Sequence, residues 1–222
     1  MGIHVVRRID ELGEGLVLAP ERHDPRRQPS PQSHPRLDSL VSLPCESATG
    51  RTLAQHPAVL ILDTSNAYEG FVVLRHAPGP VGKLGSSKRR VQPGDVLISR
   101  LRPYLRQVAF VDAGLFALVP GGNTVVVSSE FFVLRDTPHC EAAALVPFLL
   151  SSAVQGMLAA GQEGGHHPRF PRELLAALPV PQAVIARAPE LAREVRSLAG
   201  ALRGTLLQGQ ALVHSVEGST SD

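Results

Sequence analysis

A continuous segment, residues 86–111, carries a basic cluster, a tight turn, an apolar run and a second set of arginines. In Q-P-G-D at 92–95, proline and glycine occupy the two central turn positions. This predicts a type II turn in which Gly94 has a positive φ angle. The apolar run 96–99 predicts a strand, and Pro103 prevents the following edge from being a central strand. The segment is therefore expected to form a turn and a strand with arginines at their rim.

Basic side chains are concentrated in the same part of the chain. Between Arg75 and Arg106 the sequence has eight Lys and Arg residues and one acid, Asp95, so this window carries +7. The whole chain carries +2, which leaves −5 for the rest. Clustered cations supply the phosphate contacts that give nucleic-acid binding most of its affinity. The alternative is a solvated basic face without a ligand.

The composition is that of a soluble globular protein. The chain has 222 residues, 43% of them hydrophobic, enough for one core or for one core with an appendage. No stretch approaches the roughly 18 apolar residues of a membrane span, and the N-terminus lacks a signal-peptide pattern, so we expect a cytoplasmic protein with no membrane partner. Cys45 and Cys140 are too few and too scattered for a disulfide scaffold. Aromatic residues are scarce, which argues against a single-strand binder built from stacking platforms.

Apolar runs and turn residues predict a β-rich middle. The runs 59–64 and 71–74, separated by the turn N-A-Y-E-G, resemble a hairpin. Residues 1–18 could form a strand or a short helix, and a short helix is expected in 36–48. Loops are predicted at 21–36 and 76–90, a turn at 121–123, and further strands at 107–111, 115–119, 123–127 and 130–134. We expect a curled, mostly antiparallel sheet.

After Thr137 the pattern becomes helical. Residues 142–160 are apolar on nearly every face, as in a helix packed against the sheet, and Pro147 is tolerable in its first turn or at a kink. A glycine-rich loop at 161–170, a short helix at 172–177 and a long amphipathic helix at 184–216, opened by Ala188-Pro189, follow. The predicted class is α+β. We expect a domain at 1–182, then the long helix and a short disordered tail at 183–222.

The long helix has an apolar seam. Leu191, Val195, Leu198 and Leu202 are spaced 4, 3 and 4, the rhythm of a coiled coil, which resumes at Leu212. A helix of about 27 residues spans roughly 40 Å. We expect this stripe to need a partner helix, because one compact domain cannot cover it.

The order of these motifs resembles the target-recognition half of the specificity subunits of type I restriction-modification systems. The resemblance covers about residues 36–216. The matching segments are L-D-T-S-N-A (62–67), Q-P-G-D-V-L-I-S-R (92–100), S-S-E-F-F-V-L-R (128–135), F-L-L-S-S (148–152), G-Q-E-G-G-H-H-P-R-F (161–170), L-P-V-P (178–181) and the long terminal helix.

This resemblance implies a non-catalytic subunit. Members of the family read double-stranded DNA and hold an adenine-N6 methyltransferase and, in restricting complexes, a translocating nuclease on the chosen site. S-adenosylmethionine is then expected on the methyltransferase, and no cofactor on this chain. The usual Gln182 is present, but the sequence around it, P-Q-A-V-I, departs from the common pattern, which puts the usual docking onto the methyltransferase in doubt.

A full-length member has two recognition domains and two helices, whereas this chain has one of each. It therefore looks like a half-subunit. Two copies could pair their terminal helices through Leu191, Val195, Leu198, Leu202 and Leu212 and read a bipartite palindrome.

Candidate DNA contacts fall into two groups. Lys83, Lys88, Arg89 and Arg90 are predicted loop cations that meet phosphates. Base contacts are predicted from two sets, namely Arg100, Arg102, Tyr104 and Arg106, and Gln162, His166, His167 and Arg169. Arg100 could instead pair with Asp95, and Tyr104 could cap the sheet. A zinc site on His166 and His167 would need two more ligands, so we expect no metal.

Enzyme motifs are lacking. The sequence has no G-x-S-x-G, no P-loop, no paired-cysteine metal motif and no N-P-P-Y-type tetrapeptide for adenine methylation. The alternative to a DNA-reading subunit is a non-catalytic scaffold, an assembly factor or an inhibitor in a phage-defence system, whose basic face meets another protein.

Overall fold

The computed structural model describes residues 6, 8–9, 34–74, 77–80, 86–121, 124–164 and 167–219. Most of the segments 1–18 and 21–36, and two residues of the turn at 121–123, lie outside the described residues. So do the candidate DNA contacts Lys83 and His166.

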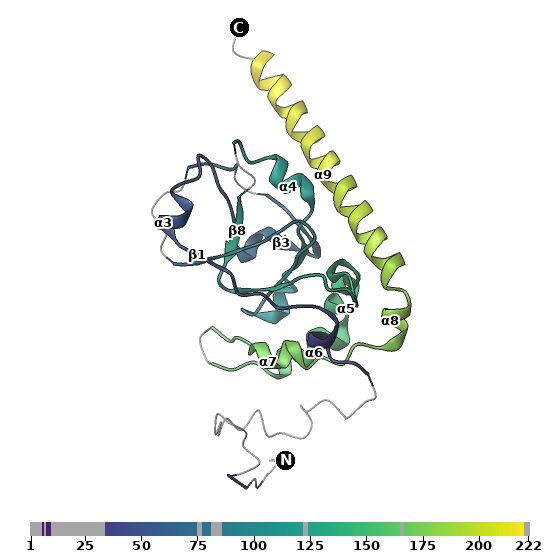
Figure 1. Ribbon diagram of the computed structural model, residues 1–222. Coiled ribbons are helices and arrows are strands. Elements are labelled where there is room, and N and C mark those ends of the chain that lie inside the picture. The colour runs from purple at the N-terminus through teal and green to yellow at the C-terminus, as the bar shows by residue number, and fades with distance from the viewer. Residues whose placement is uncertain are drawn as a thin grey trace.

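Two mixed sheets form the centre of the protein (Figure 1). The first has the order β1-β5-β8-β2, with β1 at Ser47–Ala48, β5 at Lys88–Arg90, β8 at Val125–Ser128 and β2 at Leu60–Leu62. The second has the order β3-β4-β7-β6-β9, with β3 at Ala67–Tyr68, β4 at Gly70–Val72, β7 at Val108–Phe110, β6 at Val96–Ser99 and β9 at Phe131–Leu134. Among these strands five neighbouring pairs are antiparallel and two are parallel. The predicted α+β class with mostly antiparallel pairing is confirmed.

Short helices surround the sheets and one long helix follows them. The helices are α2 at Leu37–Leu40, α3 at Gly50–Leu53, α4 at Ala113–Ala117, α5 at Val146–Leu150, α6 at Ser152–Ala160, α7 at Arg172–Ala176, α8 at Gln182–Ala186 and α9 at Ala188–Ser219. The 3₁₀ turns are η2 at Thr64–Asn66, η3 at Pro103–Leu105 and η4 at Ala142–Leu145.

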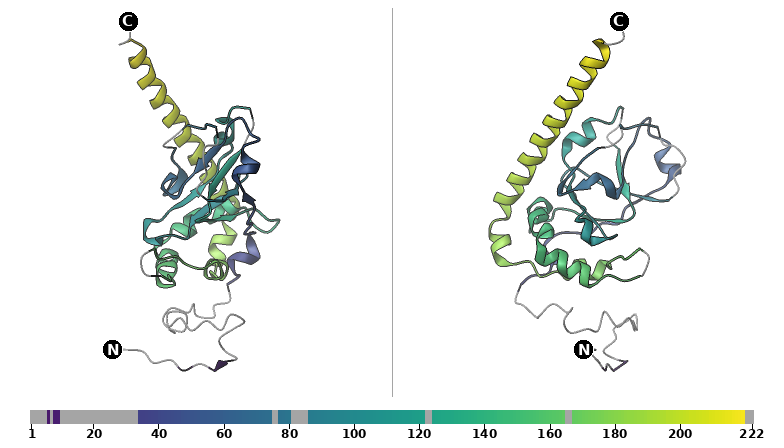
Figure 2. Two further views of the ribbon diagram at one scale, coloured as in Figure 1. Left: turned by 90° about the vertical axis from the view of Figure 1, so that its left-hand side faces the viewer. Right: turned by 180° about the vertical axis from the view of Figure 1, so that it is seen from behind.

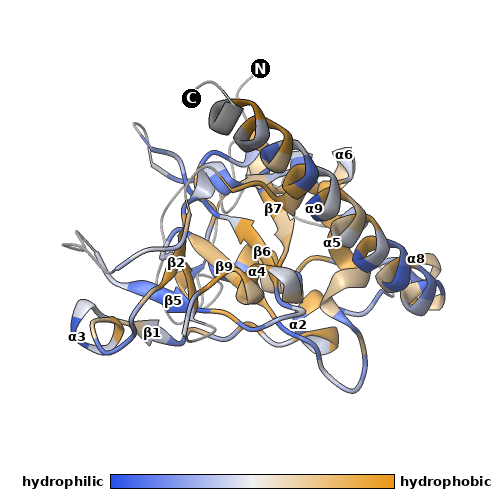
Figure 3. Ribbon diagram, turned by 90° about the horizontal axis from the view of Figure 1, so that it is seen from above, coloured by the Kyte–Doolittle hydropathy of each residue, from blue (hydrophilic) through white to orange (hydrophobic). Residues whose placement is uncertain are grey.

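The Q-P-G-D turn and the strand after it fold as predicted. Gly94 has a φ of 97°, and the Asp95 N–H donates to the Gln92 carbonyl at 3.2 Å, as in a type II turn. Strand β6 lies between β7 and β9 and is buried on both faces, with Val96 and Ile98 in one core cluster and Leu97 in the other. Burial on both faces explains why its sequence is a continuous apolar run. In Figure 3 the strands β6, β7 and β9 are apolar, whereas β5 is hydrophilic.

The expected hairpin between 59–64 and 71–74 is wrong. Strand β2 pairs in parallel with β8 in the first sheet, whereas β4 pairs with β7 in the second. The tight hairpin joins β3 to β4 through Glu69 and Gly70, which both have positive φ angles, as a type I′ loop requires. The apolar pattern identified two strands but did not identify their partners.

Two further expectations are corrected. Residues 115–119 were expected to form a strand, but α4 covers most of them, and it buries both Leu115 and Phe116 in one core cluster. The segment 184–216 is not one helix, because α8 ends at Ala186 and α9 begins at Ala188.

The apolar segment 142–160 is three short pieces. Pro147 lies in the first turn of α5, one of the two placements expected for it. Ser151 is extended, with ψ at 145°, and its hydroxyl accepts a hydrogen bond from the Val154 N–H at 3.4 Å, which starts α6 in a new direction. No single described helix is long and apolar enough to cross a membrane. The segments Ala142–Leu150 and Ser152–Ala160 reach that length and composition only together, and they are bent by 77° with respect to each other.

Helix α9 lies along one side of the domain and extends beyond it (Figure 2). Its first half packs on η4, where Ala192, Val195 and Ala199 are buried in the domain core. Val195 therefore packs inside its own domain and does not face outward as the predicted seam would require. The seam was assigned from spacing alone, which does not say which face the domain already covers.

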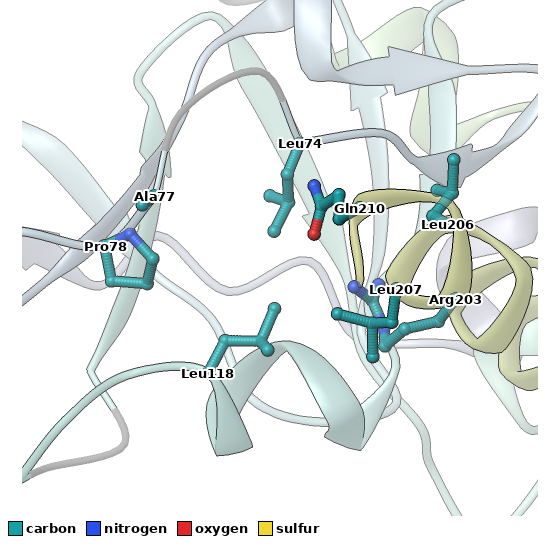
Figure 4. A pocket seen from close by; sticks show the side chains of 8 residues that line it. All are labelled: Leu74, Ala77, Pro78, Leu118, Arg203, Leu206, Leu207 and Gln210. Carbon is teal, nitrogen blue, oxygen red and sulfur yellow. The ribbon is translucent and has the colours of Figure 1, made fainter. Parts of the chain in front are cut away.

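Two ion pairs fasten α9 to the domain. Arg196 pairs with Glu141, and Arg203 donates from Nε to Asp112 at 2.7 Å in a bidentate pair. Beyond Arg203 a groove of about 260 Å³ separates Leu206 and Leu207 from the domain (Figure 4). The close contact between α9 and the domain thus ends near Arg203.

A buried ion pair holds the Q-P-G-D turn. Asp95 is 1% exposed and accepts from Nε and Nη2 of Arg135 at 2.8 and 3.0 Å and from the Gln92 N–H at 2.8 Å. Arg135 follows β9, so the pair connects the end of β9 to the start of the neighbouring strand β6. Both carboxylate oxygens are used, as burial of a charge demands.

Replacing Asp95 by Ala should destabilise the fold by about 3 kcal/mol, because Arg135 would lose its buried partner and the turn a hydrogen bond. Urea unfolding measures this change. Asp38→Ala is the matched control, since Asp38 pairs with Arg36 at the surface and should cost less than about 1 kcal/mol. Equal losses for the two variants would contradict the structural role of Asp95.

Candidate nucleic-acid interface

The turn between β8 and β9 brings the predicted basic segments together. Strand β5 lies beside β8, with Lys88 opposite Ser128, and Glu130 follows two residues after Ser128. At the end of β6, the N–H of Arg100 donates to the Glu130 carbonyl at 2.9 Å. The basic strand and the arginine segment therefore meet at the edge where the two sheets join.

Lys88, Arg89 and Arg90 form strand β5, so the loop predicted for them is wrong. Successive side chains of a strand point to opposite faces, which separates Arg89 from Lys88 and Arg90. The Arg89 guanidinium lies over the ring of Phe132, 5.9 Å from its centroid, a cation–π distance. Arg89 thus takes part in packing, and Lys88 and Arg90 are the better candidates for phosphate contacts.

One carboxylate holds two of the predicted DNA-binding arginines. Glu130 accepts from Nε of Arg100 at 3.0 Å and from Nε and Nη2 of Arg169 at 2.9 and 2.7 Å. The hydrogen bond from Arg169, with a further one from Arg100, lowers the pKa of Glu130 from 4.5 to about 2, although partial burial opposes the shift. The suggested pair between Arg100 and Asp95 is wrong.

The glycine-rich loop is joined to the arginine segment by its backbone. The Arg102 N–H donates to the Pro168 carbonyl at 3.1 Å, and the Phe170 N–H to the Arg100 carbonyl at 3.1 Å. Nη2 of Arg102 lies 3.3 Å from Nδ1 of His167. Gln162 is half-buried at the start of this loop. Among the described residues, no three His, Cys, Asp or Glu side chains gather as a metal site would require.

Strained backbone marks the outer part of this rim. Among the described residues three non-glycine residues have positive φ angles, Glu69 at 45°, Arg102 at 49° and Arg106 at 51°. Arg102 and Arg106 flank η3, which leaves the Tyr104 side chain 63% exposed. Tyr104 therefore does not cap the sheet. Left-handed backbone is unfavourable for such residues and gathers at binding and catalytic sites.

Sequence reasoning missed Glu130 and, further along this rim, Glu69 and Tyr68. Glu69 accepts from Nε and Nη2 of Arg106 at 3.1 and 3.2 Å, and its neighbour Tyr68 is 68% exposed. Gly70 after Glu69 was the available signal, because a two-residue hairpin loop favours glycine in one position. Cations still outnumber acids in the assembled surface, which we call the basic rim. It contains Lys88, Arg89, Arg90, Arg100, Arg102, Arg106 and Arg169, with the acids Glu69, Glu130 and Glu163.

Replacing Glu130 by Gln should lower the free energy of unfolding at neutral pH. In acid, the difference between the variant and the wild type should disappear. Because the folded pKa of about 2 lies below 4.5, the ionised carboxylate stabilises the fold above pH 4.5, and this stabilisation disappears as the pH falls towards 2. We expect about 2 kcal/mol at pH 7, less than the full shift implies, since solvent screens the partly exposed Arg169. Chemical unfolding over this pH range checks it. A wild-type-to-variant difference that is independent of pH would contradict the assignment.

Comparisons with known proteins extend the resemblance from motifs to three dimensions. No protein-family model and no curated protein sequence matches this chain. A solved chain from a study of complex assembly and conformational transition of the type I R-M system is 23% identical, with a TM-score of 0.54 over 84% of this chain and 51% of that chain. The HsdS subunit from Thermoanaerobacter tengcongensis is 20% identical, with a TM-score of 0.52 over 83% of this chain and 49% of that chain. The chain spans about half the length of these two structures, and over that half it has the fold of an HsdS subunit.

Proposed function

We propose that this protein is a DNA specificity subunit of a type I restriction-modification system, and that it directs an adenine-N6 methyltransferase to its target sequence. The observation that carries the proposal is the basic rim on an HsdS-like fold. Cations from β5, from residues 100–106 and from the 161–170 loop come together there, although they are far apart in the sequence. A second member of such a complex, a restriction or translocase subunit, is compatible with this role.

Two kinds of contact are available at the rim. Lys88 and Arg90 lie on one face of a strand, where they can meet phosphates without reading sequence. A second group of side chains lies on turns, from which they can reach base edges. This group contains Arg100, Arg102, Tyr104, Arg106 and Arg169. Arg100 and Arg169 are held by Glu130, which fixes their direction before DNA arrives.

The protein acts in this proposal as a binding subunit and not as a catalyst. The rim supplies guanidinium, ammonium and phenol groups, which recognise DNA but do not transfer a methyl group. S-adenosylmethionine would be bound by the methyltransferase subunit, and we assign no cofactor to this chain.

We also propose that two copies pair through the exposed flank of α9. Leu198, Leu212 and Val216 are 58, 69 and 63% exposed, and Leu198 and Leu212 are separated by two heptads. Leu191 and Leu202 are half-buried on the same flank. A two-fold dimer of this kind reads a bipartite, palindromic site.

Replacing Leu212 by Asp should convert the dimer into a monomer without unfolding the domain, because this side chain is exposed in the single copy. Light scattering or sedimentation gives the mass. Ala211→Asp is the control, since it adds the same charge to an exposed neighbour that lies off the flank. A mass unchanged by Leu212→Asp would contradict the pairing.

Replacing Lys88 and Arg90 together by Ala should weaken binding to every duplex alike and reduce the slope of log affinity against log salt by about 2. Duplex binding at several salt concentrations, with and without the cognate methyltransferase, measures this. The double variant Arg187→Ala and Arg193→Ala removes the same charge elsewhere, because Arg187 directly precedes α9 and Arg193 lies in its second turn. Absence of duplex binding by the wild-type chain with its methyltransferase, even at low salt, would refute the proposed function and favour the scaffold alternative.

A further inference from the structure

Glu69 is an unexpected residue for a surface that binds a polyanion. Its carboxylate is 46% exposed at the basic rim, where it would repel phosphates. Its backbone is also strained, with a φ of 45°. A glycine would adopt this conformation without that cost. A strained, exposed acid in this place therefore suggests a specific task.

The geometry of the pair with Arg106 indicates what that task is. Glu69 accepts from Nε and Nη2, which together form one edge of the planar guanidinium. An arginine has five N–H donors in a fixed fork, so the edge made by Nη1 and Nη2 keeps two parallel N–H groups. The Arg106 side chain is 37% exposed, and among the described residues Glu69 is its one hydrogen-bonding partner, so no described side chain occupies this second edge.

Both backbone and side chain restrict the movement of Arg106. It follows η3 directly with a φ of 51°, and its N–H donates to the Pro103 carbonyl at 2.8 Å. The carboxylate then fixes the far end of a long side chain that otherwise has many rotamers. Ordering the guanidinium before binding lowers the entropic cost of a contact made by its free edge.

We infer that Glu69 is a specificity-determining positioning residue, which holds Arg106 so that its second edge pairs with O6 and N7 of a guanine in the major groove. Guanine presents two acceptors at the spacing of that edge. The inference rests on the proposed function, since it assigns one base contact within the DNA interface. Tyr68 directly precedes Glu69 in the sequence, and Tyr104 lies two residues before Arg106. Both tyrosines are exposed, and they would border the same base pair.

Selection from a pool of duplexes with randomised base pairs tests the inference, with the full-length chain and its methyltransferase. Wild type should select a motif with a guanine at one position per half-site. Glu69→Gln should reduce the preference for that guanine roughly tenfold, while binding to unselected duplexes stays equal or rises because a negative charge is lost. Arg106→Lys should lose the same preference, since an ammonium has no second edge.

Glu190→Gln is the matched control, because Glu190 also accepts a bidentate pair, from Arg187, at the surface of α9. It should leave the whole motif unchanged. A Glu69→Gln variant that keeps the guanine preference, or that loses binding equally on all duplexes, would overturn the inference and leave the proposed function standing. Failure of the wild-type complex to select any motif would instead refute the proposed function, and the inference with it.

Discussion

The position of the basic rim depends on the ion pair between Asp95 and Arg135. Arg135 contacts the carboxylate of Asp95 at the start of β6 and that of Glu46 just before β1. The Glu46 carbonyl in turn accepts from the Arg90 N–H at 2.8 Å. Through Asp95 and Glu46, one guanidinium therefore connects β6 and β9 of one sheet to the basic strand β5 of the other. This connection adds to the pairing of β5 with β8 and to the backbone hydrogen bond from Arg100 to Glu130, which hold the same two segments together.

Two acids within the basic rim form salt bridges that hold its arginines in place. Like charges packed at one edge repel each other, and Glu130 offsets that repulsion by holding Arg100 and Arg169 together. Glu69 does the same for Arg106. The three non-glycine residues with positive φ angles in the described chain lie here too, so this region carries backbone strain that the rest of the described fold avoids. Backbone strain gathered at one exposed edge is typical of a binding site.

The parts of the fold that could be predicted are those whose conformation is determined by a few adjacent residues. Q-P-G-D, V-L-I-S and Pro147 carry their conformations in a few adjacent residues, and each was placed correctly. Strand β5 was missed because its three residues are all cationic, so no apolar pattern marks it. Its strand character comes from pairing with β1 and β8. Periodicity carries no information on contacts between residues that are distant in the sequence. Such contacts determine which strands pair, which arginines Glu130 and Glu69 hold, and why Val195 is buried.

In the proposed function, this chain selects the sites at which a partner methylates adenine. Profiling adenine methylation across the genome, with and without the gene for this chain, measures this selection. We predict one bipartite, palindromic motif whose adenines are methylated only when the chain is present. Identical methylated motifs in both strains would contradict the proposed function.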